Sequence, residues 1–239
     1  MILRVKFTKE NYLKYISHLD LMRLFQRTFR RANIPINYSE GFNPQPKFSI
    51  ANPLALGIES IEEYMDIDLY RSMAVEDFIE RMNEELPEDI RVKDAKYTED
   101  NRSISSLICW SYYEIEFIAN KLENKEKLKE MFSKWLEKDK IIIKKIKRKG
   151  KKITERDQNI KPLIGSLTYY GSKESFYYTQ NDKFLGHLET DRINITNEGT
   201  CFTEYKINLH CILKAGDNGN LKPTDFVEAI DRDLDLGID

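Results

Sequence analysis

Residues 17–31 read SHLDLMRLFQRTFRR and have the pattern of an amphipathic helix. Ser17 is a preferred N-cap residue, because its hydroxyl can accept a hydrogen bond from a free backbone N–H of the first turn. At about 100° per residue, apolar and charged side chains fall on opposite sides. The apolar side holds Met22, Phe25, Phe29 and Ala32, and the charged side holds Asp20, Arg23, Arg27, Arg30 and Arg31. The stretch therefore predicts a helix that packs on a core and presents a row of arginines.

A loop rich in turn-forming residues follows, reading YSEGFNPQPKFS over residues 38–49. Its central motif residues are Gly41, Asn43, Pro44 and Pro46. Gly41 supplies a positive φ angle or room for a close ligand. Phe42 either stands exposed on the loop or folds back onto the core. We interpret the first half of the chain as a scaffold that presents this helix and this loop side by side.

Hydrophobic alternation and periodicity around the helix predict a β-α-β-β-α-β order. We expect strands at residues 2–7, 47–51, 63–69 and 90–97, and a second helix at 75–86 that Pro87 ends. Residues 12–16 are expected to extend the first strand beyond a turn. This order is that of the ferredoxin-like split-βαβ arrangement.

The second half repeats a similar pattern after a polar linker at residues 98–106. We predict strands at 107–119, 141–146 and 205–213, a helix from an Asn124 cap to Lys138, and a last helix capped by Thr224. Residues 155–200 give no clear assignment. The fold class predicted is α+β, with two ferredoxin-like domains in tandem at 1–98 and 107–239. Each would have an antiparallel sheet with helices on one face.

Composition limits the class of protein. The 239 residues carry a formal net charge of −2, with 33% charged and 41% hydrophobic residues, so global charge favours no particular partner. The three cysteines form no CxxC pair, which fits a reducing compartment. No apolar run is long enough to span a membrane, and no secretory signal is present. We expect a cytoplasmic protein without a membrane partner.

The best anion-binding candidates are Arg23, Arg27, Arg30, Arg31 and Lys47. Arginine suits phosphate, because its planar guanidinium donates two parallel hydrogen bonds. An exposed Phe42 beside these cations would stack on a nucleic-acid base. The alternative is a solvated helix face whose arginines pair with Asp20 and Glu40.

The most basic run of the chain covers residues 140–152 and resembles a strand that leads into a β-turn arm. Such an arm can contact RNA phosphates without reading sequence. The alternative is a solvated hairpin tip. The candidate RNA-binding residues in this run are Lys144, Lys145, Lys147, Arg148, Lys149, Lys151 and Lys152.

An enzymatic alternative rests on His18, Asp20 and Glu40 as an acid–base set. His18 would need a titrating partner, and Asp20, two residues away on a helix, does not face it. The other interpretation of His18 is a structural one, in which it bonds backbone at the helix start. No phosphate-binding loop, dinucleotide-binding, zinc-protease or nucleophile-elbow motif is present. Three aspartates near the C-terminus lack the twelfth-position glutamate of a calcium loop, and we predict no metal site.

These residues resemble a known family. The N-terminal motif is similar to the hallmark of the radical-SAM-linked proteins, a bacterial domain of unknown function. The matching positions are Ser17–Asp20, Arg30–Ala32, Pro35, Gly41–Pro44, Pro46, Pro53-Leu54 and Gly57. Gln45 stands where that family is expected to have histidine. Gly219–Pro223 resembles its G-N-L-R-P turn, and Asn159–Pro162 resembles its D-I-x-P motif with Asn replacing Asp. The resemblance covers essentially the whole chain.

The resemblance implies a partner and an RNA context, because members occur free-standing or fused to a radical SAM protein, and near genes for an E/G-type ribonuclease and ribosomal proteins. This chain has no CxxxCxxC motif, so we expect no cofactor in it. The leading hypothesis is an RNA-binding accessory module that presents tRNA or rRNA to a radical SAM partner. The alternatives are an RNA-processing or RNA-modifying enzyme, and a protein adaptor that docks a radical SAM enzyme around Pro44 and Pro46.

Overall fold

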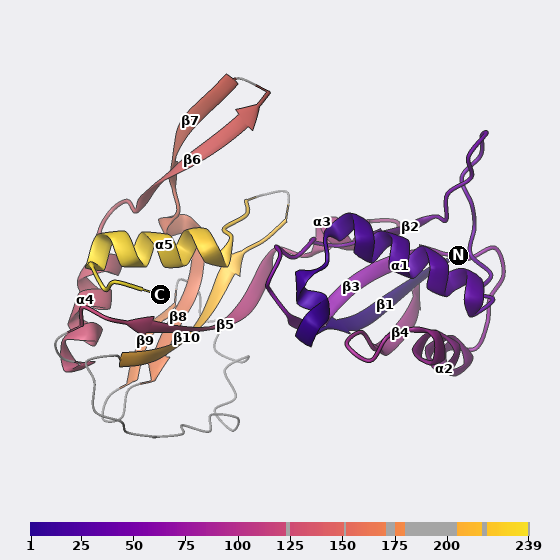
Figure 1. Cartoon of the computed structure of the whole chain (residues 1–239), viewed down its shortest axis with the longest axis horizontal. Coiled ribbons are helices and arrows are strands. Elements are labelled where there is room, and N and C mark those ends of the chain that lie inside the picture. Colours follow the sequence, from indigo (N-terminus) through magenta and orange to yellow (C-terminus); the bar gives the residue numbers. More distant parts are fainter. Residues whose placement is uncertain (123–124, 151, 171–174, 180–204, 217–218, 239) are drawn as a thin grey trace. The chain divides into compact units, whose positions relative to one another are not determined.

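The computed structural model of the chain describes residues 1–122, 125–150, 152–170, 175–179, 205–216 and 219–238. The fold is α+β with antiparallel sheets (Figure 1). The chain divides into two compact units, unit 1 at Met1–Ile108 and unit 2 at Cys109–Asp239. Among the described residues, no helix is both long and apolar enough to cross a membrane.

Unit 1 has the predicted β-α-β-β-α-β order. Its elements are β1 (Ile2–Lys9), α1 (His18–Arg31), β2 (Phe48–Ile50), β3 (Ser60–Asp68), α2 (Val75–Glu85) and β4 (Val92–Thr98). The sheet order is β2-β3-β1-β4, and each neighbouring pair is antiparallel. The predicted strand extension at residues 12–16 was wrong. Asn11 has a φ of 49°, and the chain turns there into a 3-10 helix, η1 (Asn11–Tyr15).

The core of unit 1 follows from the alternation of β1. Leu3, Val5 and Phe7 are buried in one cluster that also contains Phe25 of α1 and Phe78 of α2. Both long helices therefore cover the same face of the sheet. Arg4 and Lys6 fall on the intervening positions of β1 and face the other side, so these two charges stay out of this core.

The predicted polar linker at residues 98–106 is partly structured. Ile104 is buried, and its backbone N–H donates to the Asp66 carboxylate at 2.9 Å. Arg4 donates to the same carboxylate through two hydrogen bonds, at 2.8 and 3.0 Å. A short helix, α3 (Ile104–Leu107), follows from the Ser103 cap. A buried carboxylate on β3, which the sequence pattern does not reveal, thus holds this segment on unit 1.

Unit 2 contains a four-stranded sheet of order β5-β10-β8-β9, with each neighbouring pair antiparallel. Its elements are β5 (Trp110–Ala119), α4 (Lys125–Glu137), β6 (Ile142–Lys149), β7 (Lys152–Asn159), η2 (Lys161–Leu163), β8 (Ile164–Tyr170), β9 (Ser175–Thr179), β10 (Tyr205–Lys214) and α5 (Pro223–Leu234). The hydrophobic core of unit 2 includes Trp135 of α4, whose indole N–H donates to the Asp233 carboxylate of α5 at 2.8 Å. The proposed Asn124 cap lies outside the described residues.

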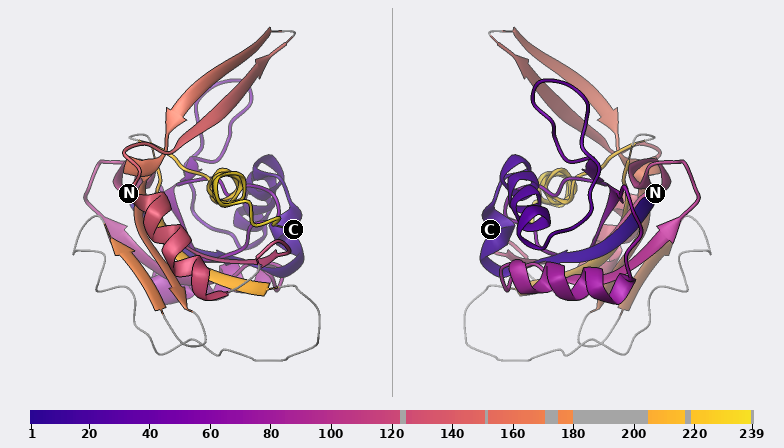
Figure 2. Two further views of the ribbon diagram at one scale, coloured as in Figure 1. Left: turned by 90° about the vertical axis from the view of Figure 1, so that its left-hand side faces the viewer. Right: turned by 90° about the vertical axis from the view of Figure 1, so that its right-hand side faces the viewer.

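The strand predicted at 141–146 forms part of β6, but it does not join the main sheet as it would in a second β-α-β-β-α-β unit. In the described part of the chain, β6 pairs with β7 in a two-stranded hairpin that extends away from the sheet of unit 2 (Figures 1 and 2). The reason is composition, because a strand with so many lysines cannot be buried on both sides. Asn159 fixes the hairpin base, since its side-chain oxygen accepts from the backbone N–H of Ile141 at 3.0 Å and of Lys161 at 3.2 Å.

The predicted Thr224 cap of the last helix was also wrong. The N-cap is Lys222, and Pro223 occupies the first helical position, where its missing N–H has no cost. After α5 the chain returns to the free edge of β5, where Ile238 forms a single antiparallel bridge with Ala119.

Candidate anion-binding site

The arginine helix α1 is held firmly from its first residue. The Ser17 hydroxyl accepts from the Asp20 N–H at 3.2 Å and lies 2.7 Å from the Asp20 carboxylate, as the predicted cap requires. Phe25 is fully buried and packs edge-on against Phe7, with ring centroids 5.0 Å apart. The buried side of α1 therefore fixes which residues face solvent.

A groove of about 480 Å³ runs along one flank of α1. It is lined by Ile16, Asp20, Arg23, Leu24, Arg27, Arg31 and Pro87. Three of the predicted anion-binding arginines thus line one groove. They follow one another at intervals of four residues, so their backbone positions lie about 6 Å apart along the helix.

The two outer arginines of the groove are paired with carboxylates. Arg23 donates to Asp20 at 3.0 Å. Arg31 donates to the Glu85 carboxylate and to the Glu85 carbonyl, both at 2.7 Å, and so binds the C-terminal end of α2. The hydrogen bond from Ser17 and then the one from Arg23 hold the pKa of Asp20 below its usual value. Asp20 and Glu85 offset two of the three positive charges in this part of α1.

Arg27, Arg30 and Lys47 are different, because these exposed cations have no hydrogen-bond or ion-pair partner among the described residues. Arg30 lies one turn after Gln26 and is not among the residues that line the groove. The Gln26 side chain donates to the Gln45 side chain at 3.4 Å, which joins this flank to the base of the motif loop. The predicted arginine row therefore contains two paired arginines, Arg23 and Arg31, and two arginines without an ion pair to any described residue, Arg27 and Arg30.

The motif loop forms a narrow ribbon that projects from unit 1 between α1 and β2 (Figures 1 and 2). A bridge between Tyr38 and Pro46 and a hydrogen bond from Ser39 N–H to the Gln45 carbonyl at 2.8 Å close its base. Gly41 has a φ of 121° at the turn, which favours glycine. Phe42 at the tip has a relative exposure of 111%, and the structure thus selects the exposed alternative.

The acid–base set His18, Asp20 and Glu40 is spread over different parts of unit 1. Asp20 lines the groove, whereas His18 and Glu40 do not. Among the residues that the structure describes, the buried Nδ1 atom of His18 has no hydrogen-bond partner, which differs from the backbone-bonded histidine of the structural interpretation. Glu40 stands exposed on the ribbon. A carboxylate with a lowered pKa, such as Asp20, is a weak base near neutral pH.

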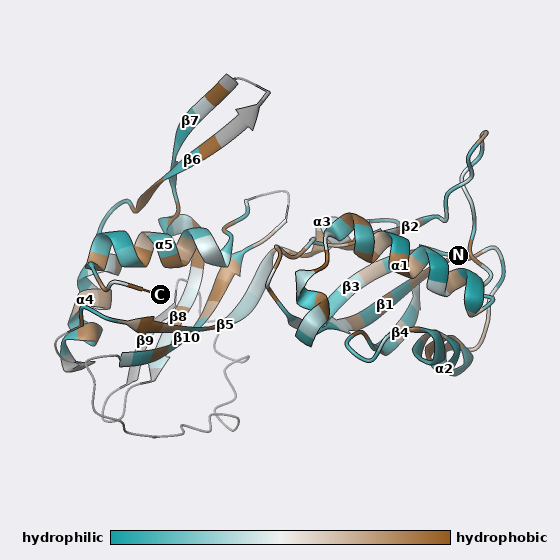
Figure 3. Ribbon diagram, viewed as in Figure 1, coloured by the Kyte–Doolittle hydropathy of each residue, from teal (hydrophilic) through white to brown (hydrophobic). Residues whose placement is uncertain are grey.

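The basic run forms the β6–β7 hairpin of unit 2. Lys144 is exposed, whereas Lys145 pairs with Asp225 of α5. The backbone of Lys147, Arg148, Lys149 and Lys152 belongs to the two strands, and Lys151 lies outside the described residues. The hairpin also exposes Ile146 and Ile153, and Figure 3 shows brown bands on both β6 and β7. The sequence pattern indicated the charge of this arm but not its apolar residues.

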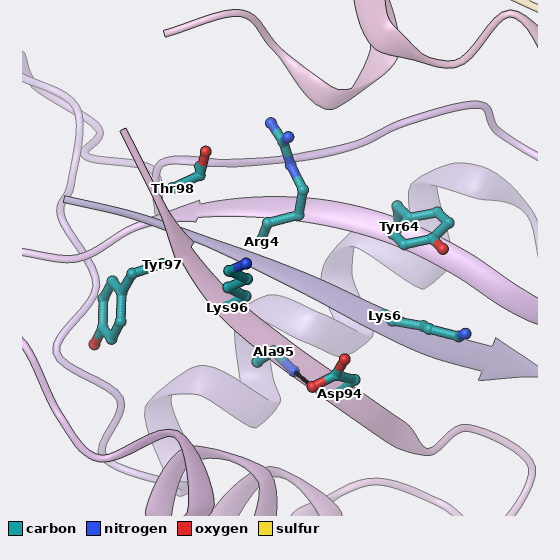
Figure 4. Close-up of a pocket in the computed structure, with 8 residues that line it drawn as sticks. All are labelled: Arg4, Lys6, Tyr64, Asp94, Ala95, Lys96, Tyr97 and Thr98. Carbon is teal, nitrogen blue, oxygen red and sulfur yellow. Dashed lines mark hydrogen bonds between the residues drawn. The ribbon is translucent and has the colours of Figure 1, made fainter. Parts of the chain in front are cut away.

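A second hollow, of about 400 Å³, lies on the helix-free face of the unit 1 sheet (Figure 4). It is lined by Arg4, Lys6, Tyr64, Asp94, Ala95, Lys96, Tyr97 and Thr98. Lys6 pairs with Glu62 at 2.9 Å, and Arg4 is held by Asp66. Its charges are thus mostly neutralised within the sheet. The alternation of β1 indicates that Arg4 and Lys6 share this face. Only the pairing of β1 with β3 and β4 shows which other residues line the hollow.

Beneath the helices, Lys9 and Glu63 form a partly buried pair of opposite charge. Lys9 is 2% exposed, and its ammonium donates to the Lys14 carbonyl at 3.3 Å. Burial lowers the pKa of Lys9 and raises the pKa of Glu63 to about 7, although Lys9 opposes that rise. Across the described residues, no group of histidines, cysteines and carboxylates could hold a metal ion.

A comparison with known protein families matches residues 3–223 to a family described as an uncharacterized protein conserved in bacteria (DUF2344). The chain belongs to the DUF2344 family. The DUF2344 match begins in β1 and ends at the first residue of α5, so it includes the groove, the ribbon and the hairpin. A search of the curated proteins found no match for this DUF2344 protein.

Proposed function

We propose that this DUF2344 protein is a non-catalytic RNA-binding accessory module, which presents tRNA or rRNA to a radical SAM partner for modification or maturation. One observation carries the proposal: the side chains of Arg27, Arg30 and Lys47 are exposed and make no hydrogen bond or ion pair with any described residue, in the same unit as a fully exposed Phe42. Free guanidinium groups donate bidentate hydrogen bonds to phosphate, and an exposed ring stacks on a base.

The β6–β7 hairpin would add sequence-independent contacts. A protruding, highly basic two-stranded ribbon suits the sugar–phosphate backbone, and its contribution would weaken as salt rises. Lys145 would serve mainly as an anchor, because Asp225 already neutralises it. The remaining cations of the arm would then contact RNA.

The radical SAM partner rests on the resemblance of the Ser17–Asp20, Gly41–Pro46 and Gly219–Pro223 segments to the radical-SAM-linked proteins. The partner would supply the cofactor chemistry. We also interpret both units as ferredoxin-like. In unit 1 the β2-β3-β1-β4 order supports this directly. In unit 2, β10 lies between β5 and β8. The Ile238 bridge to Ala119 of β5 stands where the last strand of a ferredoxin-like unit would pair, beside its first strand.

The proposal is tested by sequencing RNA crosslinked in cells to the tagged protein, with Arg27→Glu/Arg30→Glu as the test variant. A matched control is Arg81→Glu/Lys93→Glu, which makes the same charge change at two exposed positions of α2 and β4. We expect discrete tRNA or rRNA sites in the wild type and the control, and their loss in the test variant. Equal recovery from both variants, or recovery of a radical SAM protein without RNA, would refute RNA binding by this helix.

A further inference from the structure

The ring of Phe42 is the most exposed large apolar side chain of the described residues. It stands at the tip of a ribbon whose base is fixed by the Tyr38–Pro46 bridge and by the Ser39–Gln45 hydrogen bonds. From this we infer that the RNA bound by unit 1 is an unpaired segment, with a base stacked on Phe42. This inference rests on the proposed function and names its substrate class.

A duplex offers little to such a tip. In an A-form helix the base faces are stacked on one another, and the deep major groove is too narrow for side chains to read. An unpaired base presents its free face to an aromatic ring. Phe42 on a thin ribbon can therefore stack on a loop, bulge or end, but not inside a duplex without unpairing it.

The limited charge of α1 favours the same class of ligand. Proteins that bind duplexes through the backbone alone depend on many phosphate contacts. On α1, Arg23 and Arg31 are already paired with Asp20 and Glu85, which leaves Arg27 and Arg30 as the unpaired arginines. With two unpaired arginines on α1, stacking on Phe42 adds a contribution to binding by unit 1 that phosphate contacts from this helix do not supply.

The flank between α1 and the ribbon carries groups that suit a base edge. Gln26 and Gln45 share one long hydrogen bond of 3.4 Å, and the Gln45 amide also donates to the Asn43 carbonyl at 3.5 Å, so each amide keeps a further donor or acceptor. Amide side chains can hydrogen-bond the Watson–Crick edge of an unpaired base, which a duplex conceals. Arg30 follows Gln26 by one helical turn, and Lys47 follows Gln45 by two residues.

The test measures binding of the full chain to two fluorescent RNAs by polarisation. One probe is a mixed-sequence single strand of about twelve nucleotides, and the other is the same strand annealed to its complement. The variants are Phe42→Ala, Phe42→Tyr and, as a matched control, Tyr12→Ala, which removes another aromatic residue that is 85% exposed on unit 1.

We expect the single strand to bind more tightly than the duplex. Phe42→Ala should weaken its binding about tenfold, which is within the range for loss of one base stack. Phe42→Tyr should restore it and Tyr12→Ala should leave it unchanged. Equal binding of both probes, or no effect of Phe42→Ala, would overturn the inference. Arg27→Glu/Arg30→Glu separates this inference from the proposed function. If the inference is overturned but this variant abolishes RNA binding, the proposed function stands. If RNA binding survives in this variant, the proposed function itself is refuted.

Discussion

Glu85→Gln should strengthen RNA binding, because Glu85 competes with phosphate for Arg31. The carboxylate holds the Arg31 guanidinium at 2.7 Å, while the Glu85 backbone carbonyl, also at 2.7 Å, keeps the side chain in the groove. Glutamine preserves the shape of the residue and removes its charge. The groove would then offer Arg31 to a phosphate without first breaking an ion pair.

The magnitude follows from counterion release. Each additional phosphate contact to a single strand steepens the slope of log K against log salt by about 0.7, which corresponds to about fivefold tighter binding at 0.1 M salt. The loss in folding stability should be small, since the pair is partly exposed, with side-chain exposures of 51% and 37%. Exposed pairs contribute only about 0.2–1 kcal/mol.

The assay is polarisation of a labelled single strand at four or more salt concentrations. Glu84→Gln is the matched control, because it removes the same charge from an adjacent exposed position of α2. Binding by Glu85→Gln that is no tighter than by Glu84→Gln, with an unchanged salt slope, would refute the role of Arg31 as a phosphate ligand held in reserve.

Three further predictions concern the same unit. Ser17→Ala should destabilise unit 1 by about 1 kcal/mol through loss of the α1 cap, which is measured by urea unfolding followed by circular dichroism. Tryptophan fluorescence serves as the control, because both tryptophans, Trp110 and Trp135, lie in unit 2 and their unfolding transition should not move. Arg27→Gln should reduce the salt slope of RNA binding by about 0.7, whereas Arg81→Gln should not. Burial raises the pKa of Glu63 from 4.5 to about 7 in the folded state. The contribution of this group to the free energy of unfolding is therefore fully present below pH 4.5 and is lost as the pH rises to about 7. Glu63→Gln should therefore flatten the fall in unfolding free energy over that interval, and an unchanged slope would contradict the shift.

Local patterns in the sequence predicted much of unit 1. The Ser17 cap and the spacing of Phe25 and Phe29 located α1, because both signals lie within one helix. The alternation of Leu3, Val5 and Phe7 likewise indicated which face of β1 is buried. These features depend on neighbours a few residues apart, which a sequence pattern records.

Features that depend on distant residues were not predictable. Arg31 and Glu85 are 54 residues apart, so no local pattern shows that this arginine is paired. The Asp66 carboxylate that orders α3 is 38 residues from Ile104. The pairing of β6 with β7 was not predicted either, because residues 155–200 give no clear assignment and the partner strand therefore has no signal of its own. The candidate site was therefore predicted as a set of residue types, but not as paired and unpaired arginines.

The exposed ribbon tip also offers a protease a peptide bond at the end of a projecting loop. Chymotrypsin prefers to cut after aromatic residues in exposed loops, and Phe42 is such a residue. A cut there would leave β1 and α1 in one fragment and β2, β3, α2 and β4 in the other. Because β1 lies between β3 and β4 in the sheet, the two fragments would remain paired along both edges of β1. We therefore expect a unit 1 nicked at the tip to stay associated through β1, and the rate of nicking to report whether a ligand covers Phe42.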